Sequence, residues 1–288
     1  MNARADDLDA LRNEIDALDD RMHELLMRRT EVVQRIASVK RRDGEPLSYM
    51  RPGREAVILR RLLARHQGEL PKTVVARIWR ELISALCRIQ GPLKVAVLAP
   101  EKSVGYWDMA RRQFGSSTPM TLHRSAQNVL RAVAAGGGTV GILPLPHDDE
   151  QDPWWPHLAA GGDTAPQVIG RLPFLRDNSG QFEDVSALVV ANMAPEASGE
   201  DASLLAVTVE QEISRGRLME LMRQAELPAH SIASRRNLDV GAIELHLLEI
   251  QGFVPRGDPR LGRFLDLAKQ TVQRAVPLGA YALPIPVG

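Results

Sequence analysis

Several features that mark common protein classes are scarce in this chain of 288 residues. Cysteine occurs once, at Cys87, which excludes a disulfide framework and a cysteine-based metal site and gives no sign of secretion. The 36 Lys and Arg residues balance the 36 Asp and Glu residues, so charge gives no reason to expect nucleic-acid or acidic-membrane binding. Charged residues also interrupt every apolar stretch before it reaches the length of a signal peptide or membrane span. A cytoplasmic protein with no nucleic-acid and no membrane partner is therefore expected.

Apolar residues, in contrast, are abundant. They make up 44% of the chain, and the length favours two or more domains. Residues 1–92 are predicted to form an all-helical domain, which Gly91-Pro92 ends. Its three expected helices, interrupted by a break at 42–46, cover residues 8–40, 52–66 and 71–90.

Beyond residue 92 the pattern alternates between strands and helices. Within residues 93–193, strand candidates at 93–99, 120–124 and 139–146 are separated by helices, which indicates βαβ units on a parallel sheet. Two further strands are expected at 166–174 and 184–191. Residues 194–201 have the composition of a linker. Residues 202–288 then predict the β-α-β-β-α-β order of a ferredoxin-like domain.

An arginine interrupts the apolar seam of the first helix. Apolar residues recur there at alternating spacings of three and four, typical of a helix packed along its length. They are Leu8, Leu11, Ile15, Leu18, Met22 and Leu25, followed after Arg29 by Val32, Ile36 and Val39. A lone arginine in such a seam can simply lie along apolar surface, or it can fix the register of packing.

Two other cations favour a ligand at Arg29. Lys40 follows about three turns later on nearly the same face, whereas Arg12 precedes Arg29 by about 25 Å along the axis. An antiparallel partner helix in a two-fold homodimer would bring a second Arg12 beside Arg29 and Lys40. Three cations at a buried seam repel one another, so the arrangement favours a compact dianion such as a dicarboxylate.

Polar residues on the other two helices extend this candidate site. Arg54 and Glu55 begin the second helix, and Gln90 continues the apolar stripe of the third helix, formed by Trp79, Leu82, Ile83 and Leu86. For Glu55 and Gln90 taken alone, a solvated helix surface or a helix-end cap is the ordinary alternative.

Together these positions resemble the all-helical chorismate mutases over residues 6–92. The matching residues are Leu11-Arg12, Ile15-Asp16, Leu18-Asp19, Arg29, Lys40, Pro46, Arg54-Glu55, Trp79 and Gln90. The resemblance implies three helices in an intertwined homodimer that rearranges chorismate to prephenate. That reaction is intramolecular, so no nucleophile, metal or cofactor is expected. Arg29 and the partner's Arg12 would bind the two carboxylates of chorismate.

The resemblance also implies roles around the breaking ether bond. Lys40 and Gln90 would donate hydrogen bonds to the ether oxygen, Glu55 would accept one from the ring hydroxyl, and Arg54 would shape the pocket. Two positions depart from the family pattern. Leu86 stands where a serine is common, and Tyr49-Met50 lie near the place of a usual acidic residue.

The rest of the chain resembles the other parts of bifunctional chorismate mutase–prephenate dehydratases. Residues 98–110 are similar to the glycine-rich opening of the dehydratase, but Ala99 replaces a glycine. Leu145-Pro146 replace a glutamate and an asparagine, and Ser186-Ala187-Leu188 replace threonine-arginine-phenylalanine. The region is also short, so we expect a one-lobed dehydratase-like domain without dehydratase activity.

Residues 202–288 resemble the ACT domains that follow dehydratases and bind phenylalanine. Gly216-Arg217-Leu218 and 233–236 occupy the positions of the two ACT motifs. Both a phenylalanine effector site and a domain used for dimer contacts remain open. For the whole chain, two alternatives to the mutase remain: an isochorismate pyruvate-lyase, and a non-catalytic regulatory or scaffold protein of aromatic amino-acid biosynthesis.

Overall fold

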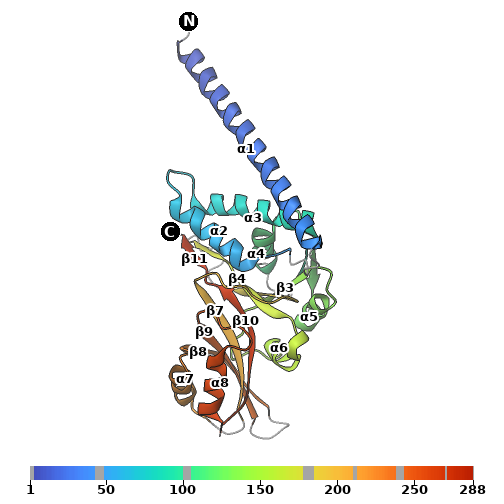
Figure 1. Ribbon diagram of the computed structural model, residues 1–288, viewed down its shortest axis with the longest axis vertical. Coiled ribbons are helices and arrows are strands. Elements are labelled where there is room, and N and C mark those ends of the chain that lie inside the picture. The colour runs from blue at the N-terminus through green and yellow to red at the C-terminus, as the bar shows by residue number, and fades with distance from the viewer. Residues whose placement is uncertain are drawn as a thin grey trace.

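The computed structural model describes residues 3–42, 49–99, 105–177, 185–209, 213–237, 243–269 and 271–287. Figure 1 shows a long helix, α1 (Ala3–Arg42), projecting from a body in which helices lie against a twisted sheet. Most of the predicted break after α1, residues 43–46 with Pro46, lies outside the described residues. None of the described helices has a stretch both long and apolar enough to cross a membrane.

The other two predicted helices are α2 (Pro52–Arg65) and α3 (Lys72–Gln90). The buried stripe of α2 is Ala56, Leu59 and Leu63, at spacings of three and four, and it packs against Val75 and Ala76 of α3. Phe174 and residues near the C-terminus join the same cluster. The α2–α3 pair therefore shares a core with the rest of the chain.

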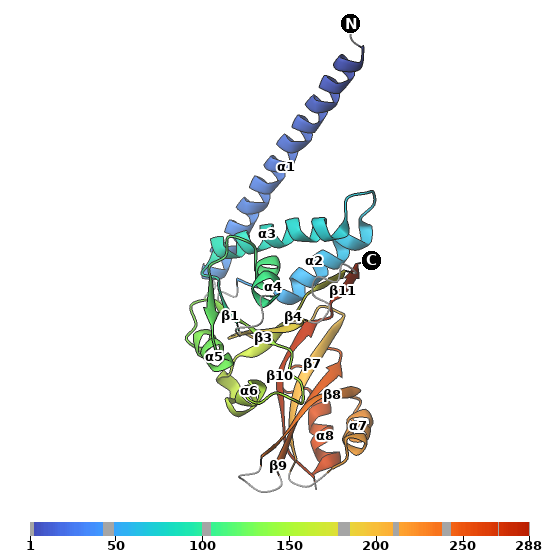
Figure 2. The ribbon, with the colours of Figure 1, turned by 180° about the vertical axis from the view of Figure 1, so that it is seen from behind.

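Helix α1, in contrast, leaves most of its apolar seam uncovered. The helix projects away from the body in both views (Figures 1 and 2), and its seam residues from Leu8 to Leu25 are 50–66% exposed. Packing begins only near the C-terminal end of α1, where Ala37 is 3% exposed against the α3 side. An exposed apolar stripe of this length is typical of an interaction surface.

The α/β region begins with three parallel strands, as predicted. Strand β1 (Lys94–Leu98) pairs with β2 (Met120–His123) on one side and β3 (Thr139–Pro144) on the other. The intervening helices are α4 (Gly105–Phe114) and α5 (Ala126–Ala134). This confirms the βαβ units, since parallel neighbours need a crossover connection.

One of the later strands of this region runs the other way. After α6 (Trp155–Ala160) and the short helix η1 (Gly162–Thr164) come the strands β4 (Gln167–Leu172), β5 (Leu175–Asp177) and β6 (Ala187–Ala191). Strand β6 lies antiparallel between β3 and β4. The sheet is thus mixed rather than parallel throughout. The described residues between β4 and β6 form only β5, and no crossover helix is among them.

The C-terminal region has the predicted β-α-β-β-α-β order and ends in a short extra strand. Its elements are β7 (Asp201–Val209), α7 (Arg215–Gln224), β8 (Ala229–Asn237), β9 (Ile243–Gln251), α8 (Pro259–Ala268), β10 (Val272–Ala282) and β11 (Ile285–Val287). Strand β7 starts at the last residue of the predicted linker. Strand β10 also pairs with β4, at Gly279 and Val168, so the two regions share one nine-stranded sheet.

Polar contacts fix α2 on this body. The Arg60 guanidinium donates hydrogen bonds to Ser198, to the carbonyl of Glu200 and to the carbonyl of Leu283. At the start of α2, a Cβ on Gly53 would come within 2.7 Å of the Glu196 carbonyl oxygen, so only glycine permits this close approach. The first turn of α2, which carries Arg54 and Glu55, is thereby positioned against the chain that leads into β7.

Candidate active site

Arg29 lies in the last third of α1, where the helix reaches α3. Its side chain is partly buried, and its Nη1 atom is buried with no hydrogen-bond partner among the described residues. Burial lowers the pKa of Arg29, and the nearby cation of Arg54 lowers it further. A partly desolvated guanidinium with an unsatisfied donor is a favourable position for a carboxylate, which would supply both the charge and the acceptor.

Glu55 occupies the first turn of α2 and is held by a cation from α3. Its Oε2 accepts a hydrogen bond from Arg80 Nη1 at 2.8 Å, and the two side chains are only 15% and 6% exposed. The Arg80 guanidinium also lies over the ring of Phe174, with 4.9 Å from Cζ to the ring centroid. Burial lowers the pKa of Arg80, and Glu55 opposes that shift. This ion pair therefore fixes the orientation of Glu55 beside α3.

Cys87 lies between these charged groups. The pKa of its thiol is raised to about 12 by burial and by Glu55, while Arg29 and Arg80 act in the opposite direction. Its Sγ donates a hydrogen bond to the Tyr49 carbonyl oxygen at 3.1 Å. A thiol with this pKa stays protonated at neutral pH, so Cys87 is no nucleophile and serves as a buried packing residue.

The remaining predicted site residues divide into two groups. Gln90 and Lys40 are partly buried at the ends of α3 and α1, and Gln90 Nε2 donates to the Leu86 carbonyl at 3.2 Å. Leu86 itself is 4% exposed, so this departure from the family pattern has become a core position. Arg12 lies far from the others on the projecting part of α1, in an exposed ion pair with Asp9 at 2.8 Å.

Within one chain, Arg29 lies near Arg54 and Cys87, and Cys87 lies near Glu55. Arg12 lies apart from these residues. Sequence reasoning missed Arg80. The signal was present, because the α3 residues Ala76, Arg80, Ile83 and Cys87 are all buried at spacings of four, three and four, and Gln90 follows after three more. Arg80 interrupts this stripe just as Arg29 interrupts the seam of α1.

Replacing Arg80 by leucine should lower the free energy of unfolding by about 3 kcal/mol, because Glu55 would remain buried without its counterion. The double replacement Arg80→Leu with Glu55→Leu should recover most of that loss, since no buried charge is left uncompensated. Urea unfolding, followed by circular dichroism, measures the free energy of unfolding of the single and the double variant. Arg61→Leu is the matched control, because Arg61 is exposed on α2 and its loss should change stability by about 0.5 kcal/mol or less. Equal stability of the Arg80→Leu and Arg61→Leu proteins would contradict a structural role for the ion pair.

Comparison with known proteins gives results for the N-terminal region and for the fold. The model of the family described as chorismate mutase type II matches residues 11–91. A bifunctional chorismate mutase/prephenate dehydratase from Pseudomonas aeruginosa is 36% identical over 151 residues, which are 51% of this chain and 41% of that protein. A 4-amino-4-deoxychorismate mutase from Streptomyces venezuelae is 33% identical over 86 residues, 29% of this chain and 81% of that protein.

The matches to the bifunctional relatives span about two fifths of their length. Among solved structures, a prephenate dehydratase from Streptococcus mutans gives a TM-score of 0.48 at 13% identity, covering 67% of this chain and 99% of that one. A structural similarity of this size says nothing about activity. The matched residues 11–91 contain Arg12, Arg29, Lys40, Arg54, Glu55 and Gln90.

Proposed function

The chain belongs to the chorismate mutase type II family through its N-terminal helices, and we propose that it catalyses the rearrangement of chorismate to prephenate. The observation that carries the proposal is Arg29, whose buried Nη1 finds no partner among the described residues and whose guanidinium lies near Arg54 and Cys87. A dianionic substrate supplies the missing acceptor.

The residues suit a reaction that needs positioning rather than a nucleophile. In the rearrangement one C–O bond breaks and one C–C bond forms within a single molecule, and no group is lost. The protein must hold the dianion in a compact conformation and stabilise charge on the ether oxygen. Arg29 and the partner's Arg12 would bind the carboxylates, Lys40 and Gln90 would donate to the ether oxygen, and Glu55 would accept from the ring hydroxyl. Gln90 would have to exchange its present bond to Leu86 for that role.

We further propose that the functional unit is a homodimer joined along α1. Support comes from the seam of α1, whose apolar side chains are at least half exposed from Leu8 to Leu25. An antiparallel second copy of α1 would cover this seam and bring its own Arg12 toward Arg29. The exposed ion pair of Arg12 with Asp9 costs little to break, since surface ion pairs contribute about 1 kcal/mol or less.

The middle region, residues 93–193, is proposed to be a dehydratase-like domain without dehydratase activity. Ala187 and Leu188, at the place of the arginine and phenylalanine of the dehydratase motif, are fully buried in the sheet. They pack against neighbouring strands and present no polar group to a substrate. Ser186 is the remaining hydroxyl of that motif.

The C-terminal region, residues 202–288 after a linker at 194–201, is proposed to be an ACT-like domain with at most weak affinity for phenylalanine. In this chain, Asp148 already contacts one ACT motif, residues 233–236, and Arg215, the residue just before the other motif. Its carboxylate accepts hydrogen bonds from the Ser234 backbone at 2.7 Å and from Arg215 Nη2 at 2.9 Å. An amino acid would have to displace this carboxylate. We therefore favour a structural role for the domain, with phenylalanine as a possible but weak effector.

Incubation of the purified chain with chorismate tests these assignments. We expect prephenate to form at enzymatic rates, with no accumulation of phenylpyruvate above the uncatalysed rate. Release of pyruvate from isochorismate, with no prephenate from chorismate, would instead identify the lyase. No turnover of either compound without an added partner enzyme would favour the regulatory or scaffold protein.

A further inference from the structure

Helix α2, whose first turn carries Glu55, is attached to segments that lie outside the mutase helices. The Arg60 guanidinium ties the middle of α2 to groups just before β7 and just after β10. The buried side of α2 packs in one cluster with α3, with Phe174 and with residues at the C-terminal end of the chain. The position of Glu55 therefore depends on residues beyond 92.

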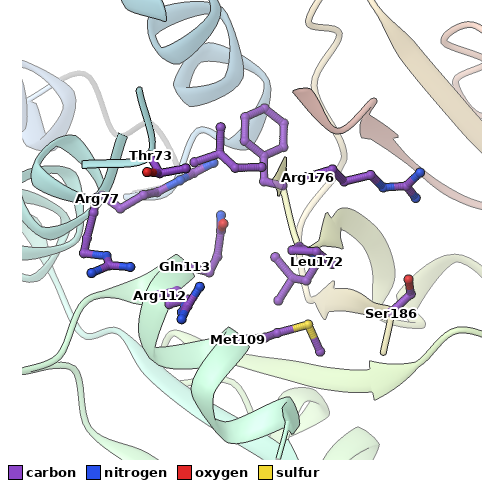
Figure 3. A pocket seen from close by; sticks show the side chains of 12 residues that line it. Thr73, Arg77, Met109, Arg112, Gln113, Leu172, Arg176 and Ser186 are labelled. Carbon is purple, nitrogen blue, oxygen red and sulfur yellow. The ribbon is translucent and has the colours of Figure 1, made fainter. Parts of the chain in front are cut away.

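Phe174 lies in the turn between β4 and β5, and the chain around it is well fixed. Its carbonyl oxygen accepts a hydrogen bond from the Ile285 N–H at 2.7 Å, and β5 pairs with β11 directly after the turn. The Phe174 side chain is 7% exposed. Figure 3 shows Leu172 and Arg176, which flank the turn, across a cavity from Arg77 of α3. The turn is thus held beside α3.

Arg80 links this turn to Glu55. Its guanidinium lies over the Phe174 ring, with Cζ 4.9 Å from the ring centroid, and its Nη1 donates to Glu55 Oε2 at 2.8 Å. The Arg80 side chain is only 6% exposed, so both contacts form where water hardly reaches. An aromatic face attracts the cation and sets the plane of the guanidinium. The direction of the N–H that reaches Glu55 therefore depends on the ring of Phe174.

We propose that Phe174 is a positioning residue for the mutase site and acts through Arg80 on Glu55. This rests on the proposed mutase function. A carboxylate has two oxygens, so Glu55 can keep Oε2 on Arg80 and accept the ring hydroxyl of chorismate with Oε1. When the ring of Phe174 is removed, the guanidinium turns and Glu55 turns with it. The middle region, residues 93–193, thereby serves the reaction as a scaffold for Glu55.

A bond to the ring hydroxyl gives this role a distinct kinetic signature. The hydroxyl takes no part in the rearrangement, so its bond to Glu55 contributes about equally to the bound substrate and to the transition state. Weakening such a bond raises KM and leaves kcat nearly unchanged. Loss of folded protein would instead lower the apparent kcat at an unchanged KM. Steady-state kinetics therefore separates a positioning role from a purely structural one.

Phe174→Leu and Phe174→Met in the full chain test the role of the ring. Both keep most of the apolar volume and remove the aromatic face. We expect each to raise KM for chorismate by about fivefold or more, with kcat within about twofold of wild type. Phe174→Tyr, which keeps the ring, should have a KM within about twofold of wild type. A lowered kcat at unchanged KM in the first two variants, or an equally raised KM in Phe174→Tyr, would overturn the role.

Val287→Ala is the matched control for lost packing. Val287 belongs to the same cluster and is 7% exposed, like Phe174, but it has no ring to place over Arg80. Its truncation should lower the stability of the cluster while KM stays within about twofold of wild type. A KM raised as much as in Phe174→Leu would show that any weakening of the cluster has this effect, and the specific role of the ring would be wrong.

Crystal structures of the wild-type, Phe174→Leu and Val287→Ala proteins test the link without reference to activity. We expect the Arg80 guanidinium and the Glu55 carboxylate to leave their wild-type positions in Phe174→Leu and to keep them in Val287→Ala. Unchanged positions in Phe174→Leu would overturn the link. If the wild type did not rearrange chorismate, the proposed function would fail while these structures still decided the positioning. If the wild type were active and KM of Phe174→Leu unchanged, only the positioning role would fail.

Discussion

Arg29→Ala is expected to lower kcat/KM for chorismate by about three orders of magnitude, or about 4 kcal/mol of transition-state stabilisation. The physical reason is that a carboxylate of the substrate loses its charged partner, the partly desolvated guanidinium of Arg29. The fold should remain, because alanine is the best helix former and the lost guanidinium nitrogen had no partner among the described residues. Steady-state kinetics measures kcat/KM, and thermal unfolding of the same preparation tests whether the fold is retained.

Arg28→Ala provides the matched control for this loss. Arg28 is the adjacent residue on α1 and is exposed, so its removal changes net charge by the same amount without touching the groove. We expect its kcat/KM to stay within about twofold of wild type. Similar activity in the two variants would contradict the role assigned to Arg29, provided that both proteins unfold at the same temperature as the wild type.

Activity recovered from two inactive proteins is the second large effect expected. Arg12→Ala should be about as inactive as Arg29→Ala if each site combines Arg29 of one chain with Arg12 of the other. When the two variants are unfolded and refolded together in equal amounts, half of the dimers are mixed. Each mixed dimer contains one site that lacks both arginines and one site that is fully wild type. The mixture should therefore regain about one quarter of wild-type activity.

The controls are each variant refolded alone, which should stay inactive, and native mass spectrometry, which establishes that mixed dimers have formed. If both arginines of a site came from one chain, every site in the mixture would lack one of them and no activity would return. A verified mixed dimer as inactive as its parents would therefore refute a site shared across α1. A monomer in solution at assay concentration would refute the dimer itself.

Local patterns in the sequence determined a large part of this architecture. The periodicity of the apolar residues placed α2 and α3 within a residue or two of their observed ends, because helix formation follows from contacts three and four positions apart. The parallel strands β1 to β3 and the β-α-β-β-α-β order of the C-terminal region followed in the same way. Arg29 was found because a cation breaks a pattern that is otherwise apolar.

Contacts between distant segments were decided by the tertiary structure alone. The direction of β6 and the pairing of β10 with β4, at Gly279 and Val168, depend on how separate strands meet in space, and no local periodicity encodes them. Arg80 could have been located in the buried stripe of α3, but its partners Glu55 and Phe174 come from α2 and from the turn after β4. Side-chain periodicity fixes which face of an element is buried, whereas the partner of that face is set by packing of the whole chain.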